Sequence, residues 1–165
     1  MVNSPTAQSP ERCASLKSSK FQPLTQLNKA TLWTAILHAL ILIPWGHGVA
    51  PLIVFEAVSI PDFVSNNFTL SVNGGHYEKA IAVSSFISLV GHILIIIGLL
   101  LKTNIRKLIF IWVGMSGLII SSLNFLFHSF DFIGYLFSFS LPFFLTFIWL
   151  IVATMRYWKI MKRTN

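Results

Sequence analysis

Charged residues and cysteines are scarce in this chain. Only 10% of its 165 residues are charged and only five are acidic, whereas 55% are hydrophobic. A soluble domain usually carries about 25% charged residues, so this sequence has too few to cover a globule with a water-facing surface. The single cysteine, Cys13, excludes an intramolecular disulfide scaffold. The high apolar content excludes a disordered chain.

Motifs of common enzymes and nucleic-acid-binding proteins are missing as well. The sequence holds no Gly-rich phosphate loop, no nucleophile elbow, no HExxH and no CxxC pair. Its net charge of +7 is not accompanied by a nucleic-acid recognition motif. We therefore expect a non-enzymatic protein without catalytic residues that binds no nucleic acid.

Long charge-free stretches are the main feature that is present. Uncharged windows of 26, 22, 23 and 24 residues cover positions 30–55, 80–101, 108–130 and 132–155. A transmembrane helix needs about 20 predominantly apolar residues. The sequence therefore predicts an all-α polytopic membrane protein with four transmembrane helices in an antiparallel bundle. Around this transmembrane domain, over 30–158, we expect a flexible basic tail over 1–29, an outer loop over about 57–79 and a basic tail over 159–165.

The basic residues predict the orientation of these spans. Eleven of the 12 Lys and Arg residues fall on one side of the predicted helices, and Lys79 falls on the other. The positive-inside rule makes the basic side cytoplasmic, so both termini are expected in the cytoplasm. We expect a multi-pass protein of the inner or plasma membrane, in contact with the lipid bilayer and packed against a second copy or another membrane protein.

Polar side chains inside the predicted spans are the candidate functional residues, because burying them in hydrocarbon is costly. Counted from the inner ends of their helices, His38 and His92 lie at levels that differ by only about 3 Å. The candidates for a ligand or proton site are His38, His92, His47, Asn124 and His128. Three interpretations stay open for the two histidines: hydrogen bonds between helices, proton transfer, or binding of haem b or a divalent metal.

A second polar layer is predicted near the outer ends of the helices. It offers four candidate metal ligands, namely His47, His128, Asp131 and Glu56. Their residue types suit Zn²⁺ or Cu²⁺, but no metal-binding spacing supports such a site, and ordinary polarity at helix ends is the favoured explanation.

The segment from residue 43 to residue 51 is the least helical part of the predicted spans. Proline removes a backbone donor and glycine permits non-helical angles, so Pro44, Gly46, Gly48 and Pro51 are candidate hinge residues of a broken helix. The alternatives are a simple kink, or a helix that ends near Trp45 and re-enters as an outer segment.

Small residues on the second and third predicted helices indicate close packing between them. They are Ser84, Ser88, Gly91, Gly114, Gly117 and Ser121. The fourth helix is rich in phenylalanine, including Phe143, and is predicted to face lipid. Together these patterns favour a small binding, accessory or transport protein with buried histidines. The alternative is a redox membrane protein that holds haem or a metal with His38 and His92.

Overall fold

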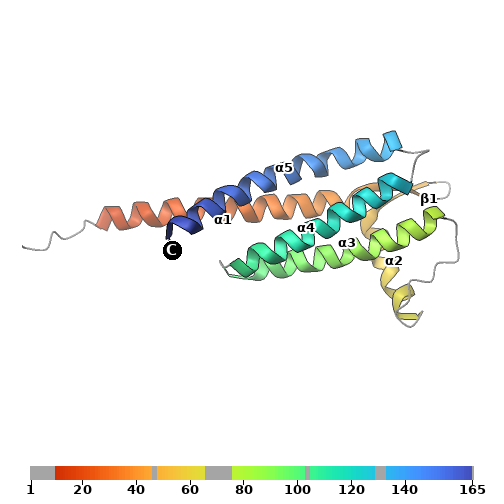
Figure 1. The fold of residues 1–165 in the computed structure, drawn as a ribbon, viewed down its shortest axis with the longest axis horizontal. Coiled ribbons are helices and arrows are strands. Elements are labelled where there is room, and N and C mark those ends of the chain that lie inside the picture. The colour runs from red at the N-terminus through yellow and green to blue at the C-terminus, as the bar shows by residue number, and fades with distance from the viewer. Residues whose placement is uncertain (1–9, 46–47, 66–75, 103–104, 129–132, 165) are drawn as a thin grey trace, which may run out of the picture.

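The computed structural model describes residues 10–45, 48–65, 76–102, 105–128 and 133–164. In chain order they form helix α1 (Pro10–Ala39), strands β1 (Leu42–Trp45) and β2 (Gly48–Pro51), and helices α2 (Leu52–Ser65), α3 (His76–Leu100), α4 (Ile105–His128) and α5 (Ile133–Thr164). Figure 1 shows an elongated bundle of α1, α3, α4 and α5, with the hairpin and α2 near one end. The most extensive contacts join α3 to α4 and α1 to α5.

Three of the described helices are long and apolar enough to cross a membrane. These candidate spans are Lys79–Leu100, Ile105–Phe127 and Ser138–Lys162, which overlap the last three windows expected from the sequence. Many large apolar side chains face outward, and 66% of the surface of Phe127, for example, is exposed. In contrast, the polar residues Thr31 and Ser121 are fully buried. Polar groups inside and apolar groups outside reverse the usual soluble arrangement and suit a lipid solvent.

The span predicted over 30–55 is interrupted in the segment 43–51, where the sequence indicated a break in the helix. Helix α1 ends at Ala39, and β1 and β2 then pair antiparallel, with Pro44 opposite Val49 and Leu42 opposite Pro51. Pro44 and Pro51 lack the N–H groups that a helix requires. In a two-stranded hairpin both strands are edge strands, where proline is tolerated, and the neighbouring backbone groups still pair. Pro44, Gly48 and Pro51 therefore belong to strands, and Gly46 lies outside the described residues.

Helix also extends into segments that were expected to be tails and a loop. Helix α1 begins at Pro10, so the stretch 10–29 is helical, and α5 continues to Thr164. Helix α2 reaches Ser65, inside the expected outer loop. Proline is favoured at a first helical position, and the Met, Lys and Arg residues near the end of α5 are good helix formers.

Glycine brings the backbones of α3 and α4 together. A Cβ atom on Gly91 would lie 2.8 Å from the carbonyl oxygen of Gly114, and one on Gly114 would lie 2.7 Å from that of Gly91. Two turns further along, the Ser121 hydroxyl donates to the carbonyl oxygen of Ser84 at 2.9 Å. This contact places the buried face of α3 firmly against α4.

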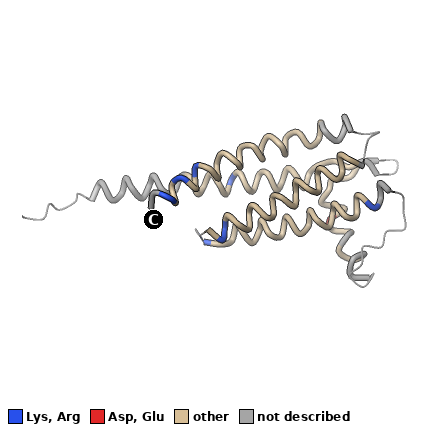
Figure 2. Tube along the Cα trace, in the orientation of Figure 1, with Lys and Arg blue, Asp and Glu red and all other residues tan. Residues whose placement is uncertain are grey.

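The described basic residues gather at one end of the bundle. Figure 2 shows the Lys and Arg positions of α4 and α5 near the end that holds the C-terminus, and a basic position near the start of α3 at the opposite end. That position is Lys79, which is exposed. The arrangement matches the charge asymmetry expected of a protein whose two ends face opposite sides of a membrane.

Candidate functional site

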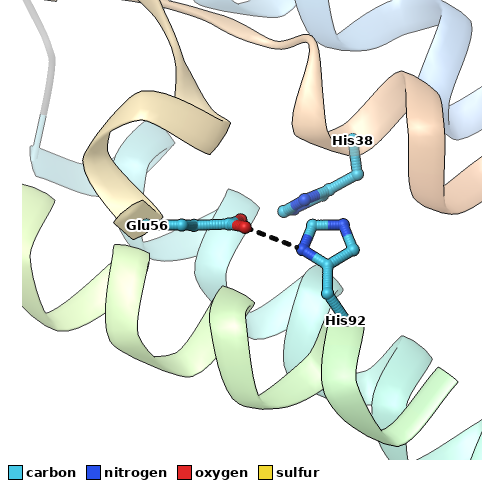
Figure 3. A group of neighbouring side chains, drawn as sticks. All are labelled: His38, Glu56 and His92. Atoms are coloured by element: carbon cyan, nitrogen blue, oxygen red, sulfur yellow. Dashed lines mark hydrogen bonds and ion pairs between the residues drawn. The ribbon is translucent and has the colours of Figure 1, made fainter. Parts of the chain in front are cut away.

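Three ionisable side chains from separate elements meet inside the bundle. His38 comes from the end of α1, Glu56 from the start of α2 and His92 from the middle of α3, and Figure 3 shows them pointing toward one another. His38 is fully buried and Glu56 is only 3% exposed. One potential ligand atom from each residue lies within 4.8 Å of the other two. We call these residues the His–Glu–His cluster.

The hairpin explains how Glu56 reaches the two histidines. Because β1 and β2 are antiparallel, the chain returns to the point at which it left α1, and the Leu52 N–H donates to the Ile41 carbonyl at 2.8 Å. Helix α2 therefore starts beside the end of α1, and Glu56 follows one turn later. The expectation that Glu56 belongs to an outer polar layer is wrong, since it shares a site with His38 and His92.

The carbonyl group of Ala35 determines which ring nitrogen of His92 carries a hydrogen atom. Its Nε2 lies 3.1 Å from the Ala35 carbonyl oxygen, and its Nδ1 lies 3.0 Å from Oε2 of Glu56. A carbonyl oxygen only accepts, so Nε2 must be the donor. In a neutral ring Nδ1 is then an acceptor, and an ionised Glu56 is an acceptor as well. Two acceptors at this distance require a positive charge between them, either a proton or a metal ion.

His38 is held in the same tautomer by the opposite wall of the site. Its Nε2 lies 3.0 Å from the Leu118 carbonyl oxygen and 3.1 Å from the Ser122 hydroxyl of α4. Its Nδ1 faces the hydroxyl of Ser88 at 3.3 Å, and that hydroxyl donates to Oε1 of Glu56. Ser88 has one hydrogen and cannot donate to both. The Nδ1 atom of His92 thus faces the carboxylate directly, whereas that of His38 faces the Ser88 hydroxyl, which bonds to the same carboxylate.

An aromatic side chain closes the cluster on the α5 side. The ring centroid of Phe143 lies 4.8 Å from that of His38, in an edge-to-face contact. The prediction that Phe143 faces lipid is wrong, because its side chain is fully buried. With little water nearby, the attraction between the cluster and a cation is stronger than it would be at a surface.

The arrangement does not fit haem between His38 and His92. Their ring centroids are 5.3 Å apart and the rings meet edge to face. Two axial ligands lie on opposite faces of a porphyrin, so the macrocycle has to fit between them. Rings in direct contact leave no such space, and we do not propose haem.

The other predicted site residues lie elsewhere or outside the described part. The Asn124 amide donates to the Ser84 hydroxyl at 2.7 Å and so joins α4 to α3, away from the cluster. The positions of His47 and Asp131 lie outside the described residues, as does the side chain of His128.

Three contributors to the site were missed from the sequence: the Ser122 hydroxyl and the carbonyl groups of Ala35 and Leu118. Ser121 belongs to the stripe of small residues that predicted packing of α4 against α3, and it does contact α3. Its neighbour Ser122 lies off that stripe and contacts His38 of α1 instead. The carbonyl groups of Ala35 and Leu118 carry no sequence signal, since every residue has one. Comparison of the chain with protein-family models, with curated proteins and with solved structures found no match.

Proposed function

We propose that this chain is a small multi-pass membrane protein that binds one divalent transition-metal ion with His38, Glu56 and His92. The observation that carries the proposal is the contact of Nδ1 of His92 with Oε2 of Glu56 at 3.0 Å, in a ring whose other nitrogen donates to a carbonyl. A metal ion between these acceptors supplies the positive charge that the contact requires. The Nδ1 atom of His38 is the third ligand.

The composition of the cluster favours zinc-like chemistry. Two imidazole nitrogens and one carboxylate form a ligand set that Zn²⁺ uses, and one that Fe²⁺ also accepts. Histidines that bind metals usually donate their second ring nitrogen to a carbonyl or carboxylate, which fixes the ring. His38 and His92 both have this support, from Leu118 and Ala35 respectively.

Binding or transport suits this site better than catalysis. The ligands come from three elements, one of which follows a re-entrant hairpin rather than a continuous helix. In many transporters, broken helices meet near the middle of the membrane and supply ion ligands there. His38 has no exposed surface, so a metal ion bound to it is enclosed, while His92, with 13% of its side chain exposed, lies on the accessible side.

The proposed topology keeps both termini in the cytoplasm. The chain enters from the basic end with α1, and α2 completes the first crossing after the hairpin. Helices α3, α4 and α5 then make the three remaining crossings. Lys79 is then the one Lys or Arg residue of the sequence on the outer side. The protein would reside in the inner or plasma membrane.

Metal titration of the purified protein tests the proposal. Metal-free protein in mild detergent is titrated with Co²⁺, which reports nitrogen and oxygen coordination through its visible absorption, and then with Zn²⁺ as competitor. We expect one metal per chain. Glu56→Gln and His92→Gln keep the size of the side chains, and each should weaken binding at least a hundredfold, since second-shell losses alone cost about 10- to 100-fold.

A matched control comes from the same face of α1. Thr34 is fully buried one turn before His38, and its hydroxyl donates to the Ala30 carbonyl rather than to the cluster. Thr34→Val should bind metal as the unmodified protein does. Unchanged Co²⁺ affinity in folded Glu56→Gln and His92→Gln protein would disprove the proposal. Zinc uptake into proteoliposomes then separates transport from binding alone.

A further inference from the structure

A large hollow in the described part lies away from the His–Glu–His cluster. It has a volume of about 710 Å³ and runs between α4 and α5. Its walls are almost entirely apolar and include Ile109 and Trp112 of α4 and Met155 and Trp158 of α5. Lys159 forms part of its rim. We call this hollow the α4–α5 groove.

Helix pairing explains why the groove exists. Helix α4 packs mainly against α3, and α5 packs mainly against α1, so few contacts join α4 to α5. Figure 1 shows the two helices separating toward the end of the bundle that holds the C-terminus. Large side chains line the opening without filling it.

The groove lies at the basic end of two candidate membrane spans. It begins at Ile105, the first residue of one span, and reaches Lys159 near the end of another. In the proposed membrane placement, the apolar walls would meet lipid tails rather than water. Three exposed cations lie at this end of the bundle: Lys102, which follows α3, Arg106 of α4 and Lys159 of α5.

We propose that the α4–α5 groove holds an acyl chain of an anionic phospholipid from the basic side of the membrane, with its phosphate at Lys159. The apolar walls match the chain, and the basic rim matches the headgroup. A cation near a membrane surface attracts an anionic lipid by about 1 kcal/mol. The proposal needs the membrane placement but not the metal site.

Charge argues against a second copy of the chain as the occupant. A second copy would have to match the basic rim with acidic residues, and the chain has only five. Of these, only Glu11 precedes the first predicted span on the basic side. A packed helix also favours small residues at the contact, whereas Trp112 and Trp158 are among the largest side chains.

Quenching of tryptophan by brominated lipids tests the groove directly. A reporter variant keeps Trp112 and Trp158 and carries Trp33→Phe, Trp45→Phe and Trp149→Phe. It is reconstituted in phosphatidylcholine vesicles that contain increasing fractions of brominated phosphatidylglycerol or brominated phosphatidylcholine. We expect about fivefold preference for the anionic lipid, the factor that corresponds to about 1 kcal/mol.

Controls separate the groove from general lipid contact. A second reporter keeps only Trp33, which is 51% exposed on α1 and does not line the groove. It should show no preference between the two lipids. In the groove reporter, Lys159→Glu should remove the preference, whereas Lys79→Glu at the opposite end should retain it.

Three outcomes would overturn the proposal. Equal quenching by both lipids would show ordinary annular contact, and a preference that survives Lys159→Glu would assign the headgroup elsewhere. Protection of Trp112 and Trp158 from both lipids would show that protein covers the groove. If the reporter variants do not fold, native mass spectrometry of the otherwise unmodified chain with Lys159→Glu or Lys79→Glu counts the phosphatidylglycerol that each retains.

Discussion

The α3–α4 pair and the segment from α1 to α2 place polar residues inside the same bundle by different means. In the pair, glycines remove side-chain bulk until the two backbones touch, and the Ser121 hydroxyl of α4 bonds to the Ser84 carbonyl of α3. In the α1–α2 segment, a hairpin returns the chain so that Glu56 joins His38 and His92. The first arrangement depends on shape and the second on charge. Substitutions should therefore affect the two regions differently.

The largest effect is expected at the backbone contact of α3 and α4. Gly114→Leu would force side-chain atoms against the Gly91 carbonyl, from which even a Cβ atom is only 2.7 Å away. Overpacking of this kind costs about 3 kcal/mol where neighbouring atoms cannot move. We expect most of the folded protein to be lost in size-exclusion chromatography and in thermal unfolding.

Gly117 provides the control for that substitution. The nearest atoms to a Cβ atom at this position are 3.5 Å away, which is an ordinary contact distance. Gly117→Ala should leave the unfolding temperature nearly unchanged. Equal losses in both variants would show that glycine content, rather than the close approach at Gly114, determines stability.

Zinc should stabilise the α1–α2 segment selectively. A ligand that binds only the folded site adds about 2.7 kcal/mol at a concentration of 100 times its dissociation constant. Hydrogen exchange of residues 52–65 should slow by about a hundredfold on zinc addition, while the α3–α4 contact changes little. Glu56→Gln protein provides the control, and a zinc effect of the same size there would contradict the assignment of the ligands.

Without metal, His92→Ala should loosen α2 more than the rest of the bundle. The substitution removes one of the hydrogen-bond partners of Glu56, whose side chain is only 5% exposed, and loss of a partner of a buried carboxylate is costly. We expect hydrogen exchange in 52–65 to rise by about tenfold, or about 1.4 kcal/mol. His92→Ala combined with Glu56→Ala should lose less stability than the sum of the two single changes. Additive losses would show that the two side chains do not interact.

The smallest effect is expected from a single hydroxyl between α3 and α4. Ser121→Ala removes the hydrogen bond to the Ser84 carbonyl, and such bonds in membranes contribute about 0.6 kcal/mol. Ser116→Ala is the control, because this exposed hydroxyl bonds to carbonyls of its own helix. Stability in a detergent titration should fall slightly for Ser121→Ala and stay constant for Ser116→Ala.

The two regions also differ in how far the sequence predicted them. Three charge-free windows predicted helices that match the candidate spans, because a membrane helix requires length and apolar composition and little else. The similar depth of His38 and His92 followed from helical rise along straight helices, but their facing each other did not. The distance of 5.3 Å between their ring centroids agrees with the similar depth.

Glu56 could not be placed in this way. If the chain between His38 and Glu56 were helical, the carboxylate would lie about 27 Å further along the axis. The antiparallel hairpin cancels that displacement, since Leu42 pairs with Pro51. Its prolines and glycines indicate that a helix is interrupted, but they do not encode the direction in which the chain continues. The position of Glu56 therefore depends on tertiary structure.

The re-entrant hairpin also has a consequence for the order of events during biosynthesis. Strands of four residues cannot enter the lipid alone, because their outer backbone groups would meet hydrocarbon. Helices α3, α4 and α5 can each insert as independent units, as helices do before they associate. The hairpin and α2 then have to dock onto a scaffold that already exists. On this order of events the His–Glu–His cluster would be completed last, and substitutions of Glu56 would alter the cluster without hindering insertion of the helices.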